Sequence, residues 1–115
     1  MQKYQEEGKL LRIFIGETDR HGHEPLYEWI VKQARAADMA GATVLRGIVG
    51  YGAGSLIHTT KILRLSEDLP VIVEIVDTKE KIDSFLPRIE AAITEGLVTV
   101  ERAHIRLYRN QKREM

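Results

Sequence analysis

Two helix-like patterns alternate with four strand-like segments along this chain, and that order restricts the folds it can adopt. Strand-forming residues cluster over residues 9–15, 44–51, 69–76 and 97–108. A helical period of apolar residues separates the first two strands and the last two. The resulting order, β-α-β-β-α-β, predicts a ferredoxin-like α+β sandwich, in which one antiparallel sheet carries two helices on one face.

The two helix patterns have recognisable ends. The first is expected over residues 26–40, after Pro25 and before Gly41, with an apolar stripe of Leu26, Ile30, Ala34, Ala37 and Ala40. The second is expected to begin at an N-cap of Asp77 or Thr78 and to end at Gly96. Its stripe is Ile82, Phe85, Leu86, Ile89 and Ile93. Pro87 lies within this stripe and predicts a kink or an irregular turn.

Residues 69–76 read LPVIVEIV, a nearly continuous apolar run typical of a strand that is buried on both faces. Two helices can cover only one face of the sheet, so the other face is expected to be buried by self-association as a homo-oligomer. The alternative is a monomer whose tail or long loop folds over the sheet. In the last strand the apolar parity changes, which predicts a bulge near residues 101–104.

A length of 115 residues predicts a single domain over 1–115, with a frayed tail at 109–115. Lys and Arg total 17, as do Asp and Glu, so no basic surplus favours nucleic acid, and the few aromatic residues form no RNA-stacking motif. The absence of Cys excludes disulfides and thiolate metal sites. No signal peptide or apolar span is evident, which predicts a cytoplasmic protein without membrane insertion.

Glycines at alternate positions, Gly50, Gly52 and Gly54, close the second strand and open a long connection. Glycine lets backbone amides approach a ligand closely and form a concave cluster that holds anionic oxygen. The alternative is a simple bend at the end of a strand. The Walker and Rossmann glycine patterns are both absent.

The connection over residues 52–68 is longer than those of most compact domains and is too apolar for a mere tether. We expect it either to dock on a neighbouring subunit or to become ordered when a ligand or partner binds. The polar residues of this predicted partner and effector loop are Ser55, His58, Lys61 and Arg64.

A further candidate site is the pair His21 and His23, which lies among Glu17, Asp19 and Glu24. Imidazole and carboxylate groups together can bind zinc, nickel or copper, although a solvated polar loop is the commoner structure for such a segment.

No catalytic motif is recognisable, so the sequence predicts a protein that is not an enzyme and requires no cofactor. Glu74 draws attention because it interrupts an apolar strand. It either reaches solvent or pairs with an arginine at an oligomer interface. A small enzyme with Glu74 or His58 as proton carrier is the remaining enzymatic alternative.

Several segments resemble the PII (GlnB-like) signalling proteins. These are the Thr-Val strand that ends in Gly50-Tyr51-Gly52 and the long loop that follows it. Residues 65–70 (LSEDLP) and 73–77 (VEIVD) resemble more closely an uncharacterised PII-like branch, domain-of-unknown-function one-ninety. The resemblance covers Leu10 to Tyr108.

The resemblance implies a homotrimer with inward-facing sheets and clefts between subunits that bind an adenine nucleotide, ADP, AMP or ATP. It places Gly50 and Gly52 against the ligand, and it places Arg106 and Arg109 near the phosphates. We extend this nucleotide site to the neighbouring Gly47, Tyr51 and Gly54. Two departures from PII are Ala53, where PII has a basic residue, and a phosphate loop shortened to residues 95–97.

The function implied is that of a regulatory protein that controls a transporter or an enzyme through its long loop. The alternative is a trimer that binds a divalent metal through His21 and His23, similar to the copper-tolerance proteins of the same topology.

Overall fold

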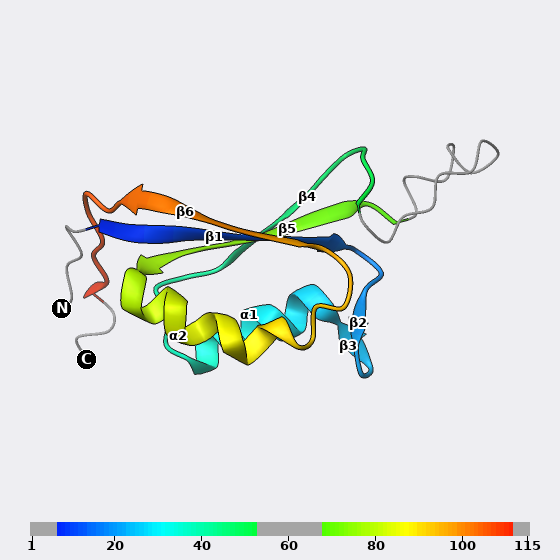
Figure 1. The fold of residues 1–115 in the computed structure, drawn as a ribbon, viewed down its shortest axis with the longest axis horizontal. Coiled ribbons are helices and arrows are strands. Elements are labelled where there is room, and N and C mark those ends of the chain that lie inside the picture. The colour runs from blue at the N-terminus through cyan, green and yellow to red at the C-terminus, as the bar shows by residue number, and fades with distance from the viewer. Residues whose placement is uncertain (1–6, 53–67, 112–115) are drawn as a thin grey trace.

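The computed structural model describes residues 7–52 and 68–111, and Figure 1 shows their arrangement. The elements follow the order β1 (Glu7–Gly16), β2 (Arg20–His21), β3 (Glu24–Pro25), α1 (Leu26–Ala36), β4 (Thr43–Arg46), β5 (Pro70–Thr78), α2 (Lys79–Glu90) and β6 (Leu97–His104). The short strands β2 and β3 pair as a small hairpin, which the sequence had indicated only as a loop.

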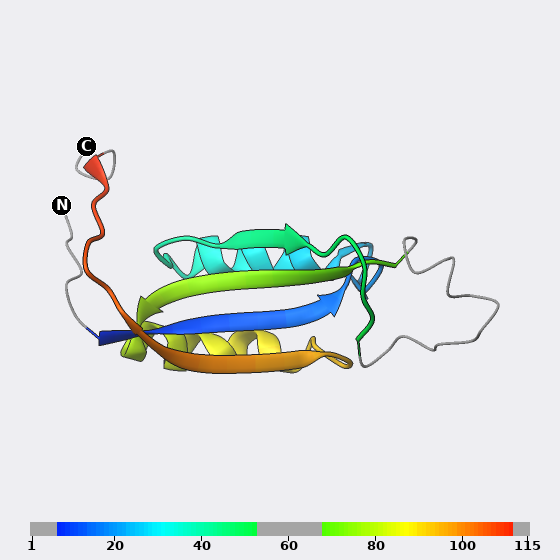
Figure 2. The same ribbon diagram turned by 90° about the horizontal axis from the view of Figure 1, so that it is seen from above.

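The four long strands form one antiparallel sheet in the order β4-β5-β1-β6. Both helices pack on the same face of this sheet (Figures 1 and 2). The predicted ferredoxin-like α+β fold is therefore confirmed. The register pairs Gly16 with Pro70 and Phe14 with Leu97, so the end of β1 meets the beginnings of β5 and β6.

The core lies between the sheet and the helices. Alternate residues of the two central strands point into it: Leu11, Ile13 and Ile15 from β1, and Val71, Val73 and Ile75 from β5. The helices contribute Leu26, Ile30, Ala34, Ile82, Phe85 and Ile89. Strand alternation and the helical stripes therefore meet in a single apolar layer.

The opposite face of the sheet, which we call the open face, has no helix over it. Within the single chain this face is only partly covered, since Val76 on it is 39% exposed. Burial of this face by self-association stays a prediction. Leu45 and Leu97 are also exposed, by 45% and 57%. The open face of the sheet is therefore partly apolar and partly exposed, whereas the face under the helices is buried.

Helix α1 ends at Ala36, earlier than the predicted residue 40. The amide of Met39 donates to the carbonyl of Ala34, and that of Asp38 donates to Arg35, both at 3.0 Å. Asp38 has a left-handed φ of 59°, so these bonds form a Schellman motif with aspartate in place of the usual glycine. The expected end at Gly41 therefore lies beyond the true cap.

Helix α2 begins as predicted, with Thr78 as N-cap and its hydroxyl oxygen accepting a hydrogen bond from the Lys81 amide. It continues through Pro87 and ends at Glu90, not at Gly96. The amides of Ala92 and Ile93 donate to carbonyls three residues earlier, which tightens the chain into turns before β6.

The predicted second strand is too long at its C-terminal end. Gly47 donates its amide to the carbonyl of Pro70 at 2.7 Å, but Pro70 has no N–H to donate in return. The ladder therefore stops after Arg46. Ile48 and Val49, which are 90% and 68% exposed, leave the sheet.

The bulge predicted in the last strand is absent. The pairing with β1 is continuous from Leu97 to His104, where the strand ends instead of continuing to Tyr108. Ile105 lies beyond this end and covers Gly8, since a Cβ on that glycine would lie 2.6 Å from the Ile105 Cδ1. The change of apolar parity thus coincides with the end of the sheet.

Within the described residues, no helix is long and apolar enough to cross a membrane.

Candidate functional site

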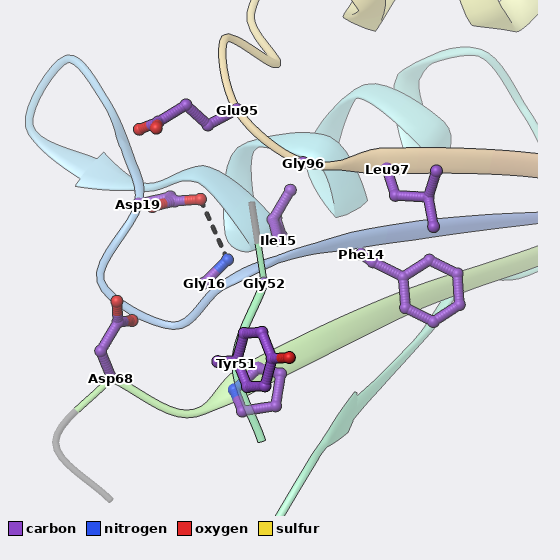
Figure 3. Close-up of a pocket in the computed structure, with 11 residues that line it drawn as sticks. Phe14, Ile15, Gly16, Asp19, Tyr51, Gly52, Asp68, Glu95, Gly96 and Leu97 are labelled. Atoms are coloured by element: carbon purple, nitrogen blue, oxygen red, sulfur yellow. Dashed lines mark hydrogen bonds between the residues drawn. The ribbon is translucent and has the colours of Figure 1, made fainter. Parts of the chain in front are cut away.

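A cavity of about 390 Å³ lies at the edge of the sheet where β1 ends and where β5 and β6 begin. We call it the strand-end cavity. Its size is within the range of small-molecule sites. Figure 3 shows how the residues that line it are placed.

Three kinds of residue line the strand-end cavity. The apolar and aromatic side chains are Phe14, Ile15, Tyr51, Pro70 and Leu97, and the glycines are Gly16, Gly52 and Gly96. The charged side chains are Asp19, Asp68 and Glu95. The lining therefore combines apolar side chains, glycines and acidic groups, and no Lys, Arg or His of the described chain belongs to it.

Gly96 has to be glycine because the chain comes into close contact with β1 there, immediately before β6 begins at Leu97. Its φ is +148°, and a Cβ there would lie 2.6 Å from the Phe14 carbonyl oxygen. This close approach holds the segment before β6 against the end of β1 and so forms one side of the cavity.

Two of the carboxylates are fixed by backbone amides. Asp19 Oδ2 accepts a hydrogen bond from the Gly16 amide at 3.0 Å, and Asp68 Oδ1 accepts one from the Thr18 amide at 3.2 Å. Both carboxylates lie over Gly16, because a Cβ there would be 2.9 Å from Asp68 Oδ1 and 3.3 Å from Asp19 Oδ1. The segment after β1 is thus tied to the start of β5.

The structure divides the glycines named from the sequence into two groups. Gly52 lines the cavity together with Tyr51 (Figure 3). Gly47 and Gly50 instead pack against Pro70, whose Cγ lies 2.8 Å and 3.2 Å from their Cβ positions. These two glycines therefore shape the path of the chain into the site.

Other predicted residues cannot be placed in the same way. Gly54 and the predicted loop residues Ser55, His58, Lys61 and Arg64 lie outside the described residues.

Arg106 and Arg109 follow β6, whose last residue pairs with Glu7 at the other end of β1 from the cavity. The hydroxyl of Tyr108, between these arginines, lies 3.4 Å from the Ala40 carbonyl oxygen and donates to it. Within one chain, the arginines and the cavity are therefore at opposite ends of the sheet.

His21 and His23, the predicted metal ligands, contact residues of their own chain. The His21 ring stacks on Trp29 of α1, with 4.0 Å between the ring centroids and 22° between the planes. The backbone carbonyl of His23 accepts a hydrogen bond from Arg20. Over residues 7–52 and 68–111, no three His, Asp or Glu side chains are grouped so that they could hold a metal ion.

Glu74, the alternative proton carrier, lies on the open face far along β5 from the cavity. Its Oε2 accepts a hydrogen bond from Arg12 Nε at 2.9 Å, and Arg12 Nη1 also donates to Glu101 Oε1 at 3.1 Å. The hydrogen bond with Glu74 is the main cause that raises the pKa of Arg12. Glu74 therefore pairs with an arginine of its own chain and stays partly exposed, and its pairing at an oligomer interface stays a prediction.

Sequence reasoning did not group the acidic residues Asp19, Asp68 and Glu95 or the apolar residues Phe14 and Leu97 into one site. The sequence did indicate where the strands around the cavity begin and end, since Gly16 and Gly96 mark strand boundaries. Only the register of β1 with β5 and β6 brings these boundaries together.

Comparison with family models gives one match of nearly full length. The model DUF190, described as "Uncharacterized ACR, COG1993", matches residues 8–105. A UPF0166 protein of Aquifex aeolicus is 40% identical over 97 residues, which cover 84% of this chain and 91% of the relative. A UPF0166 protein of Methanocaldococcus jannaschii is 38% identical over 98 residues, with 84% and 90% covered.

Solved structures of CPII from Thiomonas intermedia K12 have a similar fold. CPII bound to ADP, AMP and acetate aligns with a TM-score of 0.61 at 14% identity, covering 96% of this chain and 94% of CPII. CPII bound to ADP and bicarbonate aligns with a TM-score of 0.63 at 16% identity, covering 91% and 92%. A third structure describes CPII as a nitrogen regulatory PII-like protein.

Proposed function

This chain belongs to the DUF190 family and has a PII-like fold, and on that basis we propose that it is a regulatory protein whose effector is an adenine nucleotide. The observation that carries the proposal is the strand-end cavity at the base of the 52–68 connection. CPII, which has the same fold, has been solved with ADP and AMP bound.

The lining of the cavity suits a nucleoside. Tyr51 and Phe14 offer aromatic surface for a purine ring, and Gly52, which has no described heavy atom within 4 Å of its Cβ position, leaves backbone open to a ligand. A cavity of about 390 Å³ can hold a ligand of this size.

The nucleotide site of the proposal is shared between subunits of a homotrimer. The open face supports self-association because it leaves Leu45, Leu97 and Val76 partly exposed around the Arg12–Glu74 pair. Arg106 and Arg109 lie too far along the sheet to reach the cavity of their own chain. In the proposed trimer they supply guanidinium groups to the phosphates of a nucleotide held by the adjacent subunit.

Regulation in this proposal acts through the long connection. Gly52 and Asp68 flank residues 53–67, and both line the cavity. A nucleotide that contacts both flanks favours one arrangement of the connection, and the connection binds or releases a partner such as a transporter or an enzyme.

Calorimetric titration of the purified protein with AMP, ADP and ATP tests the proposal. We expect saturable binding of at least one of them, accompanied by a rise in the unfolding temperature. The absence of both heat and stabilisation with all three nucleotides contradicts the nucleotide-binding function.

A further inference from the structure

Glu17, the first residue after β1, contacts two segments that are far apart in the sequence. Its backbone amide donates a hydrogen bond to the Leu69 carbonyl at 2.8 Å, immediately before β5 begins. Its side-chain carboxylate forms an ion pair with Arg46, the last residue of β4. One residue therefore joins the end of β4 to the start of β5.

Both of these segments continue into the lining of the strand-end cavity. On the β4 side, the Gly47 amide donates to the Pro70 carbonyl at 2.7 Å. The chain then reaches Tyr51 and Gly52, which line the cavity. On the β5 side, Asp68 and Pro70 line it directly. Glu17 thus holds together the two segments that form opposite flanks of the 53–67 connection and part of the cavity lining.

The ion pair itself lies outside the cavity. Neither Glu17 nor Arg46 is among the described residues that line it. Their side chains are 23% and 60% exposed, so solvent partly screens the pair. The hydrogen bond with Glu17 is the main cause that raises the pKa of Arg46. Its guanidinium group is therefore engaged by a carboxylate of its own chain.

We propose that Glu17 and Arg46 are positioning residues that set where Tyr51 and Gly52 lie relative to the end of β1. This inference rests on the proposed function, because a bound nucleotide is needed to reveal the effect. Without the ion pair, the end of β4 keeps its backbone bond to Pro70 but loses its link to the residue after β1. A ligand then has to restore an arrangement that the wild-type protein already holds, and its affinity falls.

The test is a calorimetric titration of Glu17→Ala and Arg46→Ala with AMP, ADP and ATP. Alanine at position 17 keeps the amide that donates to Leu69, so only the side-chain link is removed. Each variant is expected to bind the nucleotide that the wild type prefers about two- to fivefold more weakly, the range that a partly exposed ion pair can supply. A direct contact between Arg46 and phosphate would instead weaken binding in Arg46→Ala alone.

The double variant Glu17→Ala/Arg46→Ala shows whether the two side chains act as one unit. We expect it to bind the nucleotide as weakly as either single variant, because the second substitution removes a partner that has already lost its pair. Independent roles would make the two losses multiply.

Lys32→Ala is the matched control. Lys32 pairs with Glu24 at 2.8 Å, with side chains 67% and 31% exposed, and this pair joins α1 to β3 outside the cavity lining. We expect its unfolding temperature to change as little as that of Arg46→Ala, while its nucleotide affinity equals that of the wild type. Affinity and stability are thereby separated.

The outcomes distinguish the two proposals. The positioning role is overturned if Glu17→Ala or Arg46→Ala binds as tightly as the wild type, if the losses multiply in the double variant, or if Lys32→Ala loses as much affinity. In each of these cases nucleotide binding by the wild type still stands. If no adenine nucleotide binds the wild type, the proposed function fails and the positioning role fails with it.

Discussion

The guanidinium Nε of Arg12 lies 2.9 Å from a carboxylate oxygen of Glu74, across the two central strands of the open sheet face. Partly exposed apolar residues lie on the same face, among them Leu45 and Val76. The direct cross-strand neighbours of the pair are Thr99 and Thr43, and Arg12 also donates to Glu101. In the proposed interface the pair is therefore part of a polar network between apolar side chains. We therefore expect the Arg12–Glu74 pair to lie in the interface of the proposed homotrimer.

Reversing the charge of Glu74 is expected to dissociate the oligomer. We expect the wild-type protein to sediment at about three times the 13.1 kDa chain mass, and Glu74→Arg to sediment as a smaller species because two guanidinium groups would then face each other. Sedimentation equilibrium at micromolar concentration measures both masses. Glu80→Arg, the same change on the outer surface of α2, should leave the mass unchanged. A wild-type monomer would contradict the proposed trimer.

Replacing Gly52 by alanine is expected to weaken nucleotide binding without lowering the stability of the fold. Among the described residues, no heavy atom lies within 4 Å of the Cβ position, so the free protein should keep its unfolding temperature. The added methyl group would occupy part of the cavity, and we expect nucleotide affinity to fall by about tenfold, the loss typical of a 1.4 kcal/mol penalty. Thermal unfolding and calorimetry measure the two effects. Gly41→Ala, equally free of steric conflict but outside this cavity, should change neither.

Alanine at Gly96 is expected to destabilise the fold itself. The methyl group would lie 2.6 Å from the Phe14 carbonyl oxygen, in a backbone conformation with φ of +148°. Strained backbone of this kind costs about 1–3 kcal/mol, and the steric conflict adds to it. Urea unfolding should show a midpoint well below that of wild type. A midpoint equal to that of Gly41→Ala would contradict the close packing of β6 on β1.

The pH dependence of stability is expected to reveal the Asp83 ion pairs. Hydrogen bonds from Lys79 and Lys9, at 2.8 Å and 2.7 Å, lower the pKa of Asp83. A carboxyl group whose pKa is lower in the folded state stabilises the fold above its unfolded pKa, and this contribution disappears as pH falls through the folded value.

Comparison with Asp83→Asn isolates this contribution. Urea unfolding at pH 7 should show the wild-type protein as the more stable of the two. The difference should shrink below about pH 4, the usual range of an aspartate, as protons compete for the carboxylate. A difference that stays constant from pH 7 to pH 3 would show that the ion pairs do not contribute to stability.

The order of elements could be predicted from the sequence because apolar periodicity is a local property. The helical stripe of Ile82, Phe85 and Ile89 was evident, and the N-cap was narrowed to Asp77 or Thr78, of which the structure shows Thr78. Helix ends were less predictable. Asp38 takes the left-handed position usually held by glycine, which moves the end of α1 away from Gly41.

Only part of the candidate site could be predicted, because the site depends on pairing between strands that are far apart in the sequence. Tyr51 and Gly52 stood out as a glycine-rich strand end, and they do line the cavity. The carboxylates Asp19, Asp68 and Glu95 are far apart in the sequence and meet only through strand pairing. β1 pairs with strands more than 50 residues away in the sequence, so no short turn fixes their register from local residues.

A crystal structure of the protein grown with ADP tests the central claim most directly. The account predicts ADP in the strand-end cavity, with its base against Tyr51 and its ribose near Gly52 and Gly96, and with arginines of an adjacent subunit at the phosphates. ADP bound at a different place, or an empty cavity at saturating ADP, would contradict the account.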